Sequence, residues 1–236
     1  MIYITGDTHG QQDFAKIRIF TNEIKIAGED DYLIITGDFG AVWKEKTLQE
    51  ALRPYEELPF TVLFVDGNHE NFDLLDSFPV ETWNGGKIHR IRKNIIHLMR
   101  GQVYEIEGKT FFTFGGATSI DRALRTENVN WWKEELPSDK DMQEARHNLQ
   151  RVNFKVDYII THSCDERALY YPPLVGRTFQ TNKYPENAVL SEFEEKVEYK
   201  HWYFGHYHMD GDLTDKKTVL YNEIIKLGYG VKNGRL

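Results

Sequence analysis

Five short apolar runs in this 236-residue chain each lead into a residue that can ligate a metal ion. In the first third of the chain these runs alternate with segments of helical periodicity, a pattern typical of βαβ units and a parallel sheet. Parallel strands bring their carboxyl ends to one edge of the sheet, where ligands bind. We therefore expect the residues that follow the runs to lie together. They are Asp7 with His9, Asp38, Asn68, His162, and His206 with His208.

The apolar pattern also predicts the individual elements. Strands are expected over 2–5, 32–36 and 60–65, and helices over 13–27 and 48–57 lie between them. Later predicted strands lie at 95–99, 102–106, 110–114, 157–161, 201–204, 218–221 and 223–227, and later predicted helices at 139–152 and 187–198.

The three runs between 95 and 114 are typical of a hairpin or meander, because Arg100-Gly101 and the segment 107–109 separate them as turns. Such strands either extend the first sheet or form a second one. The segment from about 165 to 186 is rich in Tyr, Pro and Gly and is expected to be a variable, irregular loop. With no repeat or linker elsewhere, we expect one domain over residues 1–236.

Composition narrows the class of protein. Hydrophobic residues make up 40% of the chain and aromatic residues 14%, which excludes general disorder. No run approaches the roughly 20 apolar residues of a membrane span. The strand expected from Ile2 leaves no room for a signal peptide, and the single cysteine, Cys164, permits no internal disulfide. We expect a cytoplasmic protein with no membrane partner, in which Cys164 is a small buried apolar residue.

The formal net charge of −8 weighs against a nucleic acid polymer or an anionic lipid surface as the partner. Two divalent ions would add about +4 of charge at the site itself, so the overall charge does not oppose an anionic substrate there.

The candidate ligands are carboxylates, imidazoles and one amide oxygen, a set that suits Mn, Fe or Zn. No cysteine lies among them, so a structural zinc site is not expected. Taken singly, each motif has a simpler explanation: Gly-Asp after a strand is usually a turn, and Asn-His-Glu can cap a helix. Taken together, they supply enough donors for two ions about 3.5–4 Å apart, an arrangement that activates water against phosphate esters.

The order of these motifs resembles the calcineurin-like metallophosphoesterase superfamily. Its pattern of D-x-H, G-D, G-N-H-[DE], H and G-H-x-H is complete here between Asp7 and His208. The resemblance implies an α/β (α+β) fold, a two-sheet β-sandwich flanked by helices in four layers. It also implies a metal-dependent hydrolase of ester bonds, in which a metal-bridging hydroxide attacks phosphorus in line.

The resemblance further implies a role for each residue. Asp38 would bridge two divalent ions, for which Mn is the expected choice in vitro, and would be catalytic. His69 would not be a ligand and would act as a general acid or contact the phosphate. The first ion would be held by Asp7, His9 and His208, and the second by Asn68, His162 and His206.

One branch of the family is similar only in part. The motifs GDTHG and GNHE match the Ser/Thr protein phosphatases, but the DRG element of that branch is absent after Asp38. We therefore expect a phosphatase or phosphodiesterase that acts on a small or nucleotide-like ester. The alternatives are a nuclease that acts on nucleic acid ends, a Ser/Thr protein phosphatase, or a metal-binding scaffold without catalysis.

Three arginines are candidates for binding the substrate phosphate, because guanidinium groups pair well with phosphate oxygens: Arg122, Arg125 and Arg177. Arg122 and Arg125 could instead pair with Glu127 or Glu134. The nearby Trp131 and Trp132 either stack on a planar substrate group or pack within their own segment.

Overall fold

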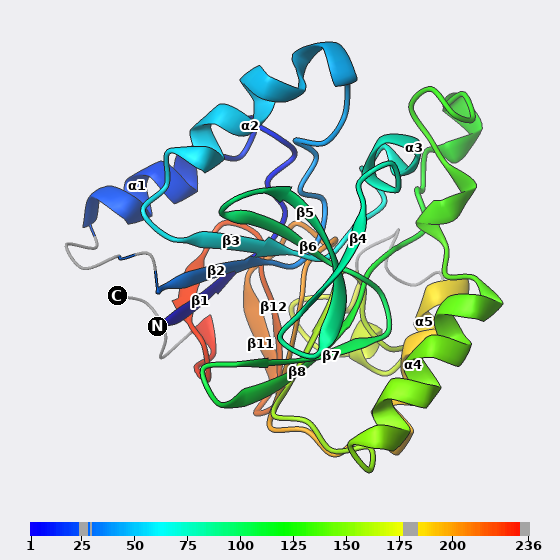
Figure 1. Ribbon diagram of the computed structural model, residues 1–236. Helices are drawn as coiled ribbons and strands as arrows, with labels where there is room; N and C mark the ends of the chain where they lie inside the picture. Colours follow the sequence, from blue (N-terminus) through cyan, green and yellow to red (C-terminus); the bar gives the residue numbers. More distant parts are fainter. Residues whose placement is uncertain (24–27, 29, 177–183, 232–236) are drawn as a thin grey trace.

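The computed structural model describes residues 1–23, 28, 30–176 and 184–231. These residues form two sheets (Figure 1). Spatial neighbours in the first, seven-stranded sheet are β13 (Ile224–Lys226), β1 (Ile2–Thr5), β2 (Tyr32–Ile35), β3 (Thr61–Phe64), β6 (Ile95–Leu98), β5 (Gly86–Arg92) and β4 (Val80–Trp83). The second, six-stranded sheet contains β11 (Gly211–Thr214), β12 (Lys217–Val219), β10 (His201–Phe204), β9 (Tyr158–Thr161), β8 (Lys109–Phe114) and β7 (Gln102–Ile106).

Each sheet has a parallel centre with antiparallel strands at its edges. Strands β1, β2, β3 and β6 are parallel in the first sheet, and β8, β9, β10 and β12 are parallel in the second. Parallel strands end at the same edge of their sheet. In each sheet, the loops that follow the parallel strands therefore lie together at that edge.

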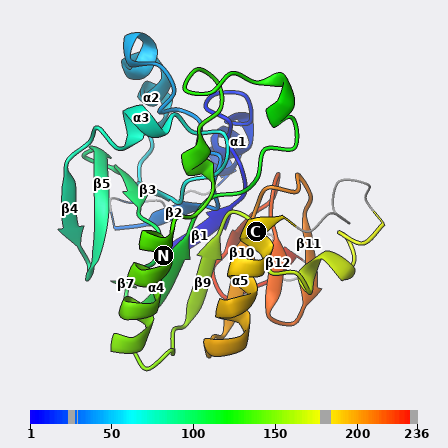
Figure 2. The same cartoon turned by 90° about the vertical axis from the view of Figure 1, so that its right-hand side faces the viewer.

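Helices cover the outer faces of both sheets. Figure 1 shows α1 (Ala15–Glu23) and α2 (Leu48–Glu56) on one side, with the short α3 (Phe72–Leu75) near them. On the other side, α4 (Asp139–Arg151) and α5 (Pro185–Lys196) lie next to each other over the second sheet (Figure 2). The order helix, sheet, sheet, helix is the four-layer α/β sandwich expected from the sequence.

Three apolar clusters hold these layers together. One lies between α1, α2 and the first sheet, and another lies between α4, α5 and the second sheet. The third fills the space between the sheets, and both sheets contribute to it: Ile4, Ile34 and Leu63 come from the first and Phe111, Ile160 and Tyr203 from the second. Within the described part of the chain, none of the helices has the length and apolar character needed to cross a bilayer.

Of the three runs between 95 and 114 that were expected to form a hairpin or meander, the last two form a hairpin and the first lies in the other sheet. Strand β6 pairs with β3 and β5 in the first sheet, whereas β7 and β8 form a hairpin in the second. The chain crosses between the sheets at Arg100-Gly101, where Gly101 has a φ of 70° and lies against α4. A further hairpin, β4–β5, was missed, although its Asn84-Gly85 turn is a strong hairpin signal. Strand β11 was also missed.

Candidate metal centre

Four of the expected ligands come together from separate parts of the chain. One ligand atom from each of Asp7, His9, Asp38 and His208 lies within 4.8 Å of the other three. Asp7 follows β1, Asp38 follows β2, and His208 follows β10 of the other sheet. Asp7 and Asp38 are buried, whereas the His208 side chain is half exposed. The group therefore sits where the carboxyl ends of strands from both sheets meet.

The remaining ligands gather on the other side of Asp38. His162 Nε2 lies 3.2 Å from Asp38 Oδ1 and 3.1 Å from Asn68 Oδ1. The ring of His206 lies 5.0 Å from that of His162, centroid to centroid. The structure thus brings all seven expected ligands into one place, with Asp38 between the two groups.

The backbone is strained at these positions. His9, Asp38, His206 and His208 have φ angles of 42°, 45°, 68° and 50°. Residues with a side chain rarely adopt this left-handed conformation, which costs free energy and concentrates at functional sites. Four of the seven expected ligands share this left-handed conformation. This indicates that the fold holds their side chains in place for a purpose other than packing.

At two positions beside the ligands, only glycine fits, because the backbone passes very close to a ligand carboxylate. A Cβ at position 67 would lie 2.0 Å from Asp38 Oδ1, and one at position 205 would lie 2.3 Å from Asp7 Oδ1. Gly67 and Gly205 therefore allow the loops of different strands to converge on the same carboxylates.

Two imidazoles are oriented by hydrogen bonds to Nδ1, the ring nitrogen that faces away from Asp38. His162 Nδ1 donates to the backbone carbonyl of Thr36 at 2.8 Å, and His9 Nδ1 lies 2.7 Å from the Asp13 carboxylate. Both partners accept hydrogen bonds only, so each Nδ1 carries a proton and each Nε2 is directed at Asp38. Metal-binding histidines are held in this way, with the nitrogen opposite the metal bonded to a carboxylate or carbonyl.

The contacts in the centre require a positive charge. When Nδ1 of His162 carries the proton, its Nε2 is a hydrogen-bond acceptor. It then faces two further acceptors, the oxygens of Asn68 and Asp38. Asp7 Oδ2 is buried and accepts no hydrogen bond, although His208 Nε2 lies 3.2 Å away. A proton or a cation must lie between such groups, so the donor set fits divalent ions of the kind expected from the sequence.

Protons take this place in the metal-free protein. Burial alone would lower the pKa of both His9 and His162, but the carboxylates of Asp38 and Asp7 outweigh burial. They raise the pKa of His9 to about 9 and that of His162 to about 10. Burial, reinforced by the charge on His162, lowers the pKa of His206 to about 3. Bound cations would displace the protons of His9 and His162.

His69 lies beside this centre and next to an arginine. Its backbone N–H donates to Asp38 Oδ1 at 2.7 Å, and its ring lies 5.3 Å from that of His9. The guanidinium of Arg125 approaches both ring nitrogens of His69, at 3.3 and 3.5 Å. Arg125 is held by Asp121 at 2.7 Å rather than by Glu127 or Glu134.

The other candidates for substrate contact lie farther away or outside the described residues. The guanidinium of Arg122 packs 5.2 Å from the centroid of the Trp131 ring. Trp132 is buried, donates to Asp73 and packs against Trp43, so its side chain joins its segment to other parts of the chain. Arg177 lies outside the described residues.

Some supporting residues were missed by the sequence analysis. Asp13 was read only as the start of a helix, although it follows His9 by four residues and so could reach it. Buried Glu70 accepts hydrogen bonds from the backbone N–H groups of Phe39 and Gly40, joining two motif loops. Cys164 is buried in the apolar cluster under α4 and α5, as expected.

Comparison with known proteins agrees with this geometry. The family model for the calcineurin-like phosphoesterases matches residues 1–210. The structure of a candidate 5′-nucleotidase from Staphylococcus aureus is 14% identical, with a TM-score of 0.50 over 95% of this chain and 50% of that one. This chain therefore spans half the length of that neighbour, and the likeness is one of fold.

Two other solved structures are more distant in shape. The phosphopantetheinyl hydrolase from Mycobacterium tuberculosis has a TM-score of 0.46 at 16% identity, over 93% of this chain and 87% of that one. A protein serine/threonine phosphatase from Saccharomyces cerevisiae has a TM-score of 0.38 at 13% identity, over 93% and 66%. No curated protein matches the chain. The family match covers most of the sequence, so the chain belongs to the calcineurin-like phosphoesterases.

Proposed function

We propose that this chain hydrolyses a phosphate ester with two divalent metal ions held between the carboxyl ends of its two sheets. The observation that carries the proposal is the position of Asp38. Its Oδ2 lies 3.3 Å from His9 Nε2, and its Oδ1 lies 3.2 Å from His162 Nε2. One carboxylate thus faces both groups of ligands. Asp7, His9 and His208 would hold one ion with Asp38, and Asn68, His162 and His206 would hold the other with it.

When bound, such ions lower the pKa of water and neutralise charge on the phosphate oxygens. The chain supplies the rest. Asp7 and Asp38 provide the negative charge that retains the ions, and His9 and His162 are already oriented toward Asp38. The left-handed backbone at four ligands is in place before any substrate arrives, which favours a site that needs little rearrangement.

His69 and Arg125 form the substrate side of the proposed site. A guanidinium can pair with two phosphate oxygens, so Arg125 is the arginine we propose to bind the phosphate. Burial lowers the pKa of His69, and a phosphate beside it would favour the protonated form. His69 could then donate a proton to the leaving oxygen.

We propose a small or nucleotide-like substrate, with Mn as the ion that supports activity in vitro. Residues 1–236 would act as one domain, because both sheets contribute ligands to the centre. A cytoplasmic location is favoured by the single cysteine, Cys164.

The test is a paired assay of Mn-loaded protein on bis-p-nitrophenyl phosphate and p-nitrophenyl phosphate, with chelated protein and Asp38→Ala as controls. We expect turnover that depends on Mn and on Asp38. Faster cleavage of the diester would identify a phosphodiesterase, and faster cleavage of the monoester a phosphatase. Absence of turnover of both esters by Mn-loaded protein would overturn the proposal.

A further inference from the structure

The side-chain amide of Asn68 has one face that can bind a cation and one that cannot. Its Oδ1 is directed at His162 Nε2, at 3.1 Å, while its Nδ2 donates to Ser119 Oγ at 3.2 Å. A rotation of the amide by half a turn would exchange these atoms and direct an NH₂ group at the centre. An NH₂ group donates hydrogen bonds and does not ligate cations. The partner of Nδ2 therefore helps to determine which atom of Asn68 faces the centre.

Ser119 is fixed as an acceptor for Asn68. The Ser119 hydroxyl donates to Glu135 Oε2 at 2.6 Å, and the Ser119 backbone N–H donates to Glu135 Oε1 at 3.0 Å. A carboxylate only accepts, so the hydroxyl proton of Ser119 is directed away from Asn68. The oxygen lone pairs of Ser119 then remain for the Asn68 NH₂ group. All three side chains are buried, Glu135 completely so.

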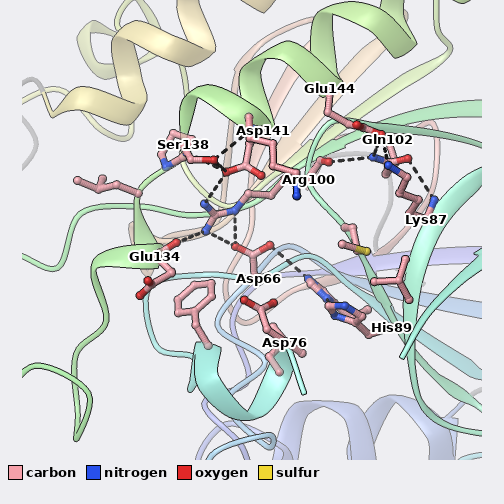
Figure 3. A pocket seen from close by; sticks show the side chains of 18 of the residues that line it. Asp66, Asp76, Lys87, His89, Arg100, Gln102, Glu134, Ser138, Asp141 and Glu144 are labelled. Atoms are coloured by element: carbon pink, nitrogen blue, oxygen red, sulfur yellow. Dashed lines mark hydrogen bonds and ion pairs between the residues drawn. The ribbon is translucent and has the colours of Figure 1, made fainter. Parts of the chain in front are cut away.

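Arg100 connects the backbone at Glu135 to the start of the loop that carries Asn68. Arg100 Nη2 donates to the backbone carbonyls of Glu134 at 2.9 Å and Glu135 at 3.2 Å, and also to Asp66 Oδ2 at 2.5 Å. Figure 3 shows Arg100 extended between Asp66 and Glu134, at the wall of a pocket of about 700 Å³. Asp66 precedes Asn68 by two residues. Arg100 thus fastens the Glu135 segment to the Asn68 loop from behind.

We infer that Ser119 and Glu135 are positioning residues that keep the Asn68 carbonyl oxygen directed at the metal centre. The inference rests on the proposed function, since Asn68 matters in this way only as a metal ligand. Neither residue is one of the seven proposed ligands, and both act on the centre through Asn68. Removing the hydroxyl of Ser119 would take away the hydrogen bond that the Asn68 NH₂ group makes in this orientation, and so weaken the preference for it.

The test is Mn²⁺ binding to wild-type and Ser119→Ala protein, by calorimetry and by the EPR signal of a spin-coupled Mn pair. Loss of a hydrogen-bonding partner behind a ligand weakens metal affinity about 10–100-fold. We expect Ser119→Ala to lose the coupled signal and to bind one of its two ions more weakly by that factor.

The neighbouring residue supplies a matched control. Thr118 makes the same pair of hydrogen bonds to the buried Glu186, at 3.1 Å from its N–H and 2.6 Å from its hydroxyl, and among the described residues no hydrogen bond joins its side chain to a proposed ligand. Thr118→Ala should therefore keep both ions. If Ser119→Ala fails to fold, Glu135→Gln replaces it and Glu186→Gln becomes the control. In Glu135→Gln, an NH₂ group can face Ser119 Oγ and direct its hydroxyl proton at Asn68, so the same loss is expected.

A second substitution separates orientation from general damage. Asn68→Asp presents an oxygen on either face, so its orientation cannot be wrong. In that background Ser119→Ala should cause no further loss of Mn affinity. An equal loss with Asn68 and with Asp at this position would overturn the inference, as would an unchanged coupled signal in Ser119→Ala. If wild-type protein itself binds no Mn pair, the proposed function fails, which is a different result.

Discussion

At the scale of single residues, the centre consists of acceptor atoms that face one another. Hydrogen bonds on the side away from the centre orient the residues that carry them. His9 and His162 are presented to Asp38 in the same way, although one is held by the Asp13 side chain and the other by a backbone carbonyl. Only the side-chain partner can be removed by substitution, so Asp13 gives a direct test of this orientation.

We expect Asp13→Asn to weaken Mn binding about 10–100-fold, because an amide can no longer hold the His9 Nδ1 proton as firmly. The measurement is Mn affinity by calorimetry. The control is Glu57→Gln, which alters an exposed carboxylate that also pairs with a residue four positions away, Arg53. Unchanged affinity in Asp13→Asn would show that His9 needs no such support.

Arg125→Ala should bind Mn normally and lose about 10–100-fold in kcat/KM, because a charge-assisted hydrogen bond is worth about 1.5–3 kcal/mol. The matched change is Arg122→Ala, where the guanidinium packs on Trp131 rather than beside His69. The measurement is kcat/KM of both variants on whichever nitrophenyl ester the wild-type protein cleaves faster. Equal losses in both variants would argue against a special place for Arg125.

The motif ligands could be predicted from sequence because each follows an apolar run and their order is informative. Their supports could not. Ser119 lies 51 positions from Asn68 and 16 from Glu135, and no local pattern links these residues. Such contacts depend on how the loops of two sheets meet.

At the scale of elements, most strands and helices followed from apolar periodicity, and α4 and β10 matched their expected ranges closely. The choice left open at 95–114 has a physical origin. Three short strands in succession are compatible with a meander and equally with a crossing between sheets. In the structure the chain crosses between the sheets at Arg100-Gly101, where Gly101 lies against α4, a contact between distant residues that no local pattern shows.

The convergence of loops makes a prediction for Gly67→Ala. The added Cβ would meet Asp38 Oδ1 and its backbone nitrogen at 2.0 and 2.3 Å, so one loop must shift. We expect about 1–3 kcal/mol of lost stability, together with loss of Mn binding. Gly28→Ala, where a Cβ would lie within 4 Å of none of the described residues, is the control. Thermal unfolding and Mn titration measure both effects, and a stable Gly67→Ala that keeps Mn would contradict this geometry.

At the scale of the whole molecule, the centre joins two sheets and its charge state bears on their stability. The pKa values of His9 and His162 are raised to about 9 and about 10. A raised pKa stabilises the folded protein fully below the ordinary value of 6.5, and this contribution is lost as the pH rises through the folded value. The metal-free protein should therefore become less stable between pH 6.5 and about pH 10.

Urea unfolding of chelated and Mn-loaded protein at these two pH values tests this expectation. Because cations replace the same protons, the stabilisation by Mn should grow as the pH rises. A stability difference between the two forms that does not change with pH would show that these protons and the ions do not compete.

The central claim is that two ions lie between the strand ends of both sheets with Asp38 between them. Anomalous diffraction at the Mn absorption edge from crystals of Mn-loaded protein tests it most directly. We predict two peaks about 3.5–4 Å apart, with one oxygen of Asp38 directed at each. A single peak, or peaks away from Asp38, would contradict the account.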